Sequence, residues 1–390
     1  MIPHLMKYMG SKREILEFIT SSIRDFNIEG EWFCDLFSGT SIVGASLRDE
    51  YNIHTNDIQS YSAVFADTYF HNLKRIINPE EIDTIRIKTL QYVYEFHTSY
   101  PEHDYNYNKI SNFSSLQQLE KKQQKFLNNQ FRMGFHLFVK YYSGTYWSYD
   151  QCVWIDSIRA VAEEYIDRPQ HRSLILSSLI YAMSYTSQST GHFAQFRDVT
   201  ESNMEDILIY RKREIWPLFQ RKFLELINSI NYETEKDFRI TTLDYIDCLR
   251  IIENNTIVYA DPPYSFVHYS RFYHAIETLV QYDYPQIKYK GRYRENRHQS
   301  PFCKKTEVRD AFTRMFHCIR ERNSHLILSY SDNGMITEGE ILKIGEDVFG
   351  NSYECHMRSQ LYSHSKMGRS DENRMNVNEL IIAYKRINHE

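Results

Sequence analysis

The tetrapeptide Asp261-Pro262-Pro263-Tyr264 has residue types and an order that suit work on a nucleobase. It follows the apolar stretch 257–260, and a loop at the carboxyl end of a strand faces the ligand crevice of an open α/β sheet. The Asp261 carboxylate and the Pro262 carbonyl would supply two hydrogen-bond acceptors on a loop stiffened by consecutive prolines. Two acceptors aimed at an exocyclic amino group would expose its lone pair, and Tyr264 would stack on the base, worth about 1–3 kcal/mol. The same residues also form turns, so the motif needs support elsewhere.

A second group of residues suits a nucleotide-like ligand. The stretch 35–44, DLFSGTSIVG, reads as a strand end, a turn of small residues and a helix start, where the backbone can approach a ligand closely. Asp57 ends the next predicted strand, 22 residues beyond Asp35. An acid at about this spacing from a glycine-containing turn typically holds the hydroxyls of a ribose. The alternative is that Asp57 is the N-cap of a helix beginning near Tyr61.

Two further sites give weaker signals. The segment Lys7–Lys12, KYMGSK, places Tyr8 and Lys12 beside a glycine, where they could hold a carboxylate such as a methionine moiety. It reads equally as a solvated helix start. Asp244 ends another predicted strand and could accept a hydrogen bond from an adenine amino group, or it could cap the helix that follows.

These residues need a sheet to bring them together. Strand, turn, helix and strand follow one another over residues 1–75, which is the opening of a doubly wound α/β sheet. Residues 76–236 are dominated by helical periodicity, including one long pattern over 115–142. The α/β pattern returns over 237–390, with a buried strand at 325–331 and a final hairpin. We therefore predict one α/β domain from 1–75 and 237–390, with 76–236 as an inserted helical domain.

In their order along the chain, Lys7–Lys12, DLFSGTSIVG, Asp57 and the Asp-Pro-Pro-Tyr motif resemble the Dam-like or D12-class DNA N6-adenine methyltransferases. The resemblance covers 1–75 and 237–390. It implies a Rossmann-like, S-adenosylmethionine-dependent methyltransferase sheet and makes 76–236 the target-recognition insertion. It implies that residues 261–264 hold a flipped-out adenine, and that the cofactor contacts are Tyr8, Lys12, Asp35, Phe37, Gly39 and Asp57. The family turn usually has glycine where this chain has Ser41; serine is small, so we expect binding to survive.

Basic residues interleaved with tyrosines follow the Asp-Pro-Pro-Tyr motif. They suit phosphate contacts near an extruded base, although a charge run is often a solvated face. In the helical block, a polar and aromatic loop carries two residue types that read base edges, although that loop could equally pack within its own domain. The predicted DNA contacts are Lys288, Lys290, Arg292, Arg294, Arg297, Gln195 and Arg197.

The composition of the 390 residues is that of a globular protein, with 42 % hydrophobic and 25 % charged residues. The net charge of −5 means that a DNA partner would need a local basic face. The six cysteines form no CxxC pair and no cluster at metal-ligand spacing, so no metal is expected. No apolar run is long enough to cross a bilayer, and the first residues lack the apolar core of a signal peptide. We expect an intracellular protein of prokaryotic or phage type.

Other functions fit the sequence less well than adenine methylation of double-stranded DNA. Carbon-5 cytosine methylation needs a nucleophilic Cys, usually after Pro, and no Cys here follows a Pro. N4-cytosine methylation would use the same logic, usually with Ser in place of Asp261, while RNA or protein amide methylation usually has Asn there. An oxidoreductase is disfavoured because no GxGxxG follows the first strand. A non-catalytic DNA-binding subunit and a restriction endonuclease partner both remain open, and a monomer would be sufficient.

Overall fold

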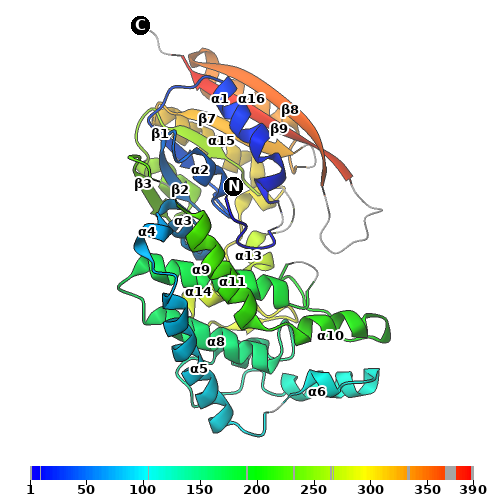
Figure 1. Ribbon diagram of the computed structural model, residues 1–390. Helices are drawn as coiled ribbons and strands as arrows, with labels where there is room; N and C mark the ends of the chain where they lie inside the picture. The colour runs from blue at the N-terminus through cyan, green and yellow to red at the C-terminus, as the bar shows by residue number, and fades with distance from the viewer. Residues whose placement is uncertain are drawn as a thin grey trace.

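The computed structural model describes residues 2–387 except for positions 9, 104, 190–191, 232, 264–265, 267, 332–333 and 365–374. A seven-stranded sheet occupies the upper half of the molecule in Figure 1, and a group of helices occupies the lower half. Within the described ranges, no helix combines the length and apolar character needed to cross a membrane.

The central sheet is mostly parallel. Its strands run in the order β3 (Phe238–Thr241), β2 (Asn52–Asn56), β1 (Trp32–Asp35), β4 (Ile257–Ala260), β7 (His325–Ser331), β9 (Met375–Arg386) and β8 (Tyr353–His364). The first five are parallel, and β9 is inserted antiparallel between β7 and β8. The predicted doubly wound sheet and the final hairpin are therefore confirmed. A separate two-stranded hairpin pairs β5 (Ile287–Lys288) with β6 (Tyr293–Arg294).

Alternation along the strands divides the core into two faces. In β4, Ile257 and Tyr259 point into one hydrophobic cluster while Val258 and Ala260 point into the other, as the period of two requires. The first face is covered by α1 (Leu16–Asp25), α2 (Ile42–Leu47) and α3 (Ser60–Phe70). The second is covered by α12 (Tyr245–Ile251), α15 (Val308–Glu321) and α16 (Glu338–Phe349). Helices thus bury both faces of the sheet, which leaves the strand ends free to build a site.

The lower half is helical, as predicted for the middle of the chain. Its helices are α4 (Leu73–Ile76), α5 (Glu81–Ser99), α6 (Phe113–Gln124), α7 (Leu137–Tyr142), α8 (Tyr149–Glu163), α9 (Pro169–Thr186), α10 (Met204–Lys212) and α11 (Ile215–Ser229), joined later by α13 (Tyr269–Phe272) and α14 (His274–Gln281). Short 3-10 turns lie at η1 (Lys12–Ile15), η2 (Tyr107–Lys109), η3 (Glu201–Asn203), η4 (Pro301–Cys303) and η5 (Gly350–Ser352).

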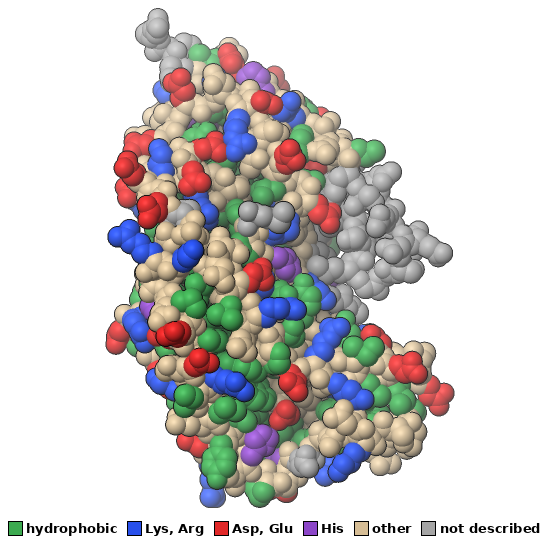
Figure 2. Space-filling model, in the orientation of Figure 1, with side chains coloured by type: hydrophobic (Ala, Val, Ile, Leu, Met, Phe, Trp, Pro, Cys, Tyr) green, Lys and Arg blue, Asp and Glu red, His purple; other side chains and the backbone are tan. Residues whose placement is uncertain are grey.

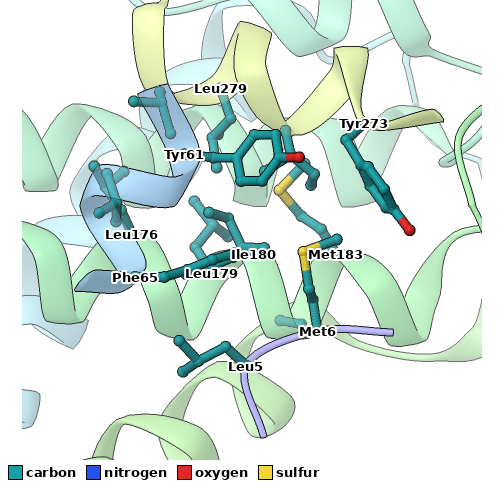
Figure 3. Packing of buried hydrophobic residues seen from close by; sticks show 14 of the residues in the cluster. Leu5, Met6, Tyr61, Phe65, Leu176, Leu179, Ile180, Met183, Tyr273 and Leu279 are labelled. Atoms are coloured by element: carbon teal, nitrogen blue, oxygen red, sulfur yellow. The ribbon is translucent and has the colours of Figure 1, made fainter. Parts of the chain in front are cut away.

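The two halves share one hydrophobic core. Helix α9 packs on α3 beneath the sheet and on α8 and α11. Figure 3 shows this junction, where Leu5 and Met6 of the N-terminal segment meet Phe65 of α3 and Ile180 of α9. The N-terminal segment is thereby fixed beside the strand ends.

The prediction of one long helical segment over 115–142 was wrong. The structure has α6 and α7 there, separated by an irregular segment in which Asn128 has a positive φ of 71° and its amide donates to the Lys140 carbonyl at 2.8 Å. Helix α7 begins where it does because the Asp156 carboxylate of α8 accepts hydrogen bonds from the amides of Phe138 and Val139, both at 2.9 Å. This cap comes from a distant residue, so local periodicity could not predict it.

Candidate active site

A pocket lies at the carboxyl ends of β1, β2, β3 and β4. It brings together most of the residues predicted to act on a cofactor or base: Tyr8, Lys12, Asp35, Phe37, Gly39, Asp57, Asp244, Asp261 and Pro263. Pro262 is buried beneath the rim, and Tyr264 lies outside the described residues. Parallel strands ending at one edge are what gather residues from such distant segments.

The turn after β1 is as tight as its small residues predict. Gly39 has a φ of +50°, and a Cβ added to it would lie 3.0 Å from the Tyr8 hydroxyl. The Tyr8 ring is held in turn by stacking on Tyr273, with the two ring centroids 4.6 Å apart. Ser41 also has a positive φ, of 56°, so this serine adopts the backbone conformation that favours glycine.

Two buried acids flank this turn. Asp35 accepts a hydrogen bond from the Gly44 amide at 3.1 Å, and burial raises the pKa of its carboxyl to about 7. Asp57 accepts from the amides of Gly39 and Gln59, both at 2.9 Å, and burial raises its pKa to about 6. Both carboxylates therefore anchor the backbone of the turn from within the pocket wall.

The helix-cap interpretation fails for Asp57 and holds for Asp244. The N-cap of α3 is Gln59, and the first amides of that helix donate to Glu277 of α14, at 3.0 and 3.2 Å. Sequence reasoning missed Glu277 because it lies more than 200 positions away. Asp244 is the N-cap of α12, where it accepts from the Ile246 amide at 3.0 Å, and it also lines the pocket. The two interpretations of Asp244 are compatible.

The Asp261 carboxylate belongs to a buried set of three charges. Lys12 Nζ lies 3.0 Å from Asp261 Oδ1 and 2.7 Å from Glu379 Oε1. Burial raises the pKa of Asp261 to about 6, against the opposing effect of the Lys12 ammonium. Sequence reasoning missed Glu379; the available signal was an acid at the start of the apolar strand ELIIAY. Contact between Lys12 and a cofactor stays a prediction.

Residues 8–328 match the D12 class N6 adenine-specific DNA methyltransferase family. The chain belongs to this family.

Three relatives of this D12-class chain are named as modification enzymes. Modification methylase LlaI of Lactococcus lactis subsp. lactis is 25 % identical over 344 residues, covering 87 % of this chain and 48 % of that protein. Type II methyltransferase M.FokI of Planomicrobium okeanokoites is 27 % identical, covering 87 % and 46 %. Type II methyltransferase M.NlaIII of Neisseria lactamica is 24 % identical, covering 87 % and 88 %. The chain thus spans about half the length of the first two.

Most of the predicted DNA-contact residues of this D12-class chain are engaged with acids. Lys288 pairs with Glu295, Lys290 with Asp198, Arg294 with Asp283, and Arg197 with Asp206. Arg292 donates to the Asn128 side chain at 2.8 Å, and Arg297 lies 3.4 Å from the Ser270 hydroxyl. Arg197 and the exposed Gln195 share a shallow hollow with Arg271. Their contacts with DNA stay predictions.

The fold also brings together a trio of side chains that sequence spacing did not reveal. Cys34, His54 and Cys248 are buried with their ligand atoms within 4.8 Å of one another, because Cys34 and His54 are partners in the β1–β2 register and α12 covers them. Thr241 donates to Asn56 and so accepts from His54 Nε2 at 2.9 Å. A ring nitrogen that carries this proton is not a metal ligand, so the trio is interpreted as core packing.

Proposed function

We propose that this chain transfers a methyl group from S-adenosylmethionine to N6 of an adenine in double-stranded DNA. The observation that carries the proposal is the position of Asp261. Its carboxylate lines the same pocket as the small-residue turn after β1 and as Asp35 and Asp57. Family membership over residues 8–328 supports the same reaction.

The proposed chemistry assigns Asp261 to the target base. Lys12 meets this carboxylate at Oδ1, and we assign Oδ2 to a hydrogen of the adenine amino group. The Pro262 carbonyl would accept the second hydrogen, so that the nitrogen lone pair turns towards the methyl donor. No covalent intermediate with the protein is needed, because positioning supplies the catalysis.

The residues of the pocket fit S-adenosylmethionine. The cofactor supplies an activated methyl group on a positively charged sulfur. Asp35, Asp57 and Asp244 offer acceptors for the hydroxyl and amino groups of its adenosine and favour a cation. Four carboxyl groups, those of Asp35, Asp57, Asp244 and Asp261, line the pocket against one Lys and no Arg among the described lining residues, and this balance favours a cationic ligand over an anionic one. The Phe37 ring packs edge-on against Phe302, with the two ring centroids 5.4 Å apart. Phe37 would offer a flat apolar surface to the adenine ring of the cofactor.

The remaining assignments follow from the proposed reaction. We propose that 1–75 and 237–390 form the catalytic domain and that 76–236 form the target-recognition insertion. An enzyme that modifies a base must first extrude it from the duplex, so DNA should bind beside the Asp261 loop. Three relatives carry names of modification enzymes, which supports a restriction endonuclease as a functional partner and an intracellular location.

The test is to incubate the protein with unmethylated genomic DNA and methyl-labelled S-adenosylmethionine, and to identify the labelled nucleoside. Label is expected in N6-methyladenosine; label in N4-methylcytosine would overturn the choice of base. Asp261→Ala should lower the rate at least about a hundredfold while the cofactor Kd changes little. Asp57→Ala should weaken cofactor binding first. Full activity of Asp261→Ala would contradict the mechanism.

A further inference from the structure

We infer that Glu379 is a positioning residue for the methyl transfer: it holds Lys12 and thereby keeps Asp261 a strong hydrogen-bond acceptor. This inference rests on the proposed function. Glu379 does not reach the pocket itself; it acts through the lysine that bridges the two carboxylates.

Contacts from two other elements, η1 and β7, fix the Glu379 side chain on β9. Glu379 lies on β9, opposite Ser331 of β7 in the strand register, and its exposed fraction is 0 %. It is on the same strand face as Ile381 and Ala383, which pack into the cluster that includes the first helices. Its Oε1 accepts hydrogen bonds from the Lys12 ammonium at 2.7 Å and from the Ser329 hydroxyl at 2.5 Å. A serine from the neighbouring strand thus fixes the carboxylate that fixes the lysine.

A carboxylate at this position is costly for the fold. Leu380, Ile381, Ile382 and Ala383 follow it along β9 and are all buried. Among the described residues, Glu379 Oε2 accepts no hydrogen bond. Burying a charge with one oxygen unsatisfied is unfavourable, and an apolar residue of similar volume is often at least as stabilising as a buried ion pair. The apolar surroundings of β9 alone therefore give no reason for an acid here, whereas the buried Lys12 ammonium does.

The effect on Asp261 follows from electrostatics. The charged groups that face Asp261 are Lys12 from η1 and Glu379 from β9, with the Asp35 carboxyl from β1 and the Tyr259 phenol from β4 nearby. If Lys12 paired with Asp261 alone, its positive charge would offset the negative charge of that carboxylate and make it a weaker hydrogen-bond acceptor. Because Glu379 shares the ammonium, the set of three keeps a net negative charge. The negative charge of Glu379 also opposes the lowering of the Asp261 pKa by Lys12.

The decisive variant is Glu379→Gln, which keeps the shape and removes the charge. It should lower the pKa of Asp261, because a like charge is lost and Lys12 is left to that carboxylate. We expect kcat to fall about tenfold, KM for S-adenosylmethionine to stay within about twofold, and the acid limb of kcat to move to lower pH by about half a unit or more. The matched control is Glu354→Gln, an exposed glutamate on the neighbouring strand β8, which should leave all three unchanged.

A readout that needs no turnover separates this inference from the proposed function. The pKa of Asp261 can be followed by carbon NMR of labelled aspartate, using Asp261→Asn to identify the resonance. A lower pKa in Glu379→Gln than in wild type supports the inference even if the wild type were inactive on DNA. An unchanged pKa and an unchanged kcat profile, with only a lower melting temperature, would show a structural role and overturn it. Should the glutamine variant not fold, Glu379→Leu avoids the buried amide and must show the same shift.

Discussion

The wall of the pocket contains the buried carboxyl groups of Asp35 and Asp57, which are shielded from the water that would stabilise their charged form. Asp35 and Asp57 lie at the ends of adjacent strands, and their oxygens accept amide protons from the turn around Gly39 and the helix after it. Each acid therefore has a structural bond as well as a place in the site. A ligand that brings a positive charge and hydroxyl donors relieves the burial of these acids, which is consistent with the proposed cofactor.

Asp35 should make stability depend on pH. Burial raises its pKa to about 7, against about 3.9 in an unfolded chain, so the folded state holds this proton more tightly. Its contribution to stability is complete below pH ~4 and is lost as pH rises towards 7. Asp35→Asn lacks this loss, so its unfolding free energy relative to wild type should increase between pH 5 and pH 8. Urea denaturation at both values measures the change, and the exposed Asp347→Asn serves as the control. A difference that is flat with pH would contradict the prediction.

Gly39 and Ser41 allow a paired test of the turn. Gly39→Ala would place a side chain at φ +50° and against Tyr8, so it should destabilise the protein by about 1–2 kcal/mol and weaken cofactor binding. Ser41→Gly removes the strain of a side chain at φ +56° and should stabilise it by up to about 1 kcal/mol. Calorimetric melting with and without S-adenosylmethionine measures both. A lower melting temperature for Ser41→Gly would contradict the prediction and would mean that the Ser41 hydroxyl has a role that glycine cannot replace.

At the scale of secondary structure, strands were more predictable than helix boundaries. The strands ending at Asp35, Asn56 and Ala260 are encoded locally, by short stretches with aromatic or β-branched residues that are followed by small, polar or acidic residues. The break between α6 and α7 and the cap of α3 depend on Asp156 and on Glu277, which are distant in sequence. Glu379 escaped prediction for the same reason: its partner Lys12 is 367 positions away. The order of the motifs predicted which segments meet at the candidate site. The charge of that site depends also on pairs of residues that are far apart in sequence, such as Lys12 and Glu379.

One such pair holds α6 against α10. Arg211 of α10 is buried and donates to both oxygens of Glu120 of α6, at 2.8 and 2.6 Å. Glu120→Ala would leave this guanidinium buried without its carboxylate, which should destabilise the protein by about 3–5 kcal/mol. The control is Glu50→Ala, which breaks a half-exposed pair with Arg24 and should lose less than about 1 kcal/mol. Chemical denaturation compares the two; similar losses would mean that the buried pair contributes no more than a surface one.

At the scale of the whole molecule, the distribution of surface charge bears on DNA binding. On the face shown in Figure 2, Lys and Arg alternate with Asp and Glu, and the described residues form no extended region of one sign there. Three of the cations predicted to contact DNA, Lys288, Lys290 and Arg294, are already paired with acids. DNA binding would therefore depend on a few cations that no carboxylate neutralises, or on exchanging internal ion pairs for phosphates.

Arg297 is the cation best placed to test this dependence. It borders a hollow with Ser270 and His298, two residues that also line the main pocket, and among the described residues it has no carboxylate partner. Arg297→Ala should weaken DNA binding and reduce the slope of log K against log salt by about 0.9, since one phosphate contact is lost. Fluorescence anisotropy at several salt concentrations measures the slope. Lys343→Ala, on α16 beyond the sheet, should not change it; an equal change in both would show a general effect of net charge.

The bridge from Lys12 to Glu379 also makes the candidate site depend on the strand β9. Lys12 lies on η1, and Glu379 lies on β9, 367 positions later in the chain. In the folded chain, β9 lies between β7 and β8 and supplies the second carboxylate that contacts Lys12. A growing or prematurely terminated chain that lacks β9 can carry every motif of the reaction and still present Asp261 with the wrong electrostatics. Under the proposed function, methyl transfer would therefore depend on a sheet that includes β9.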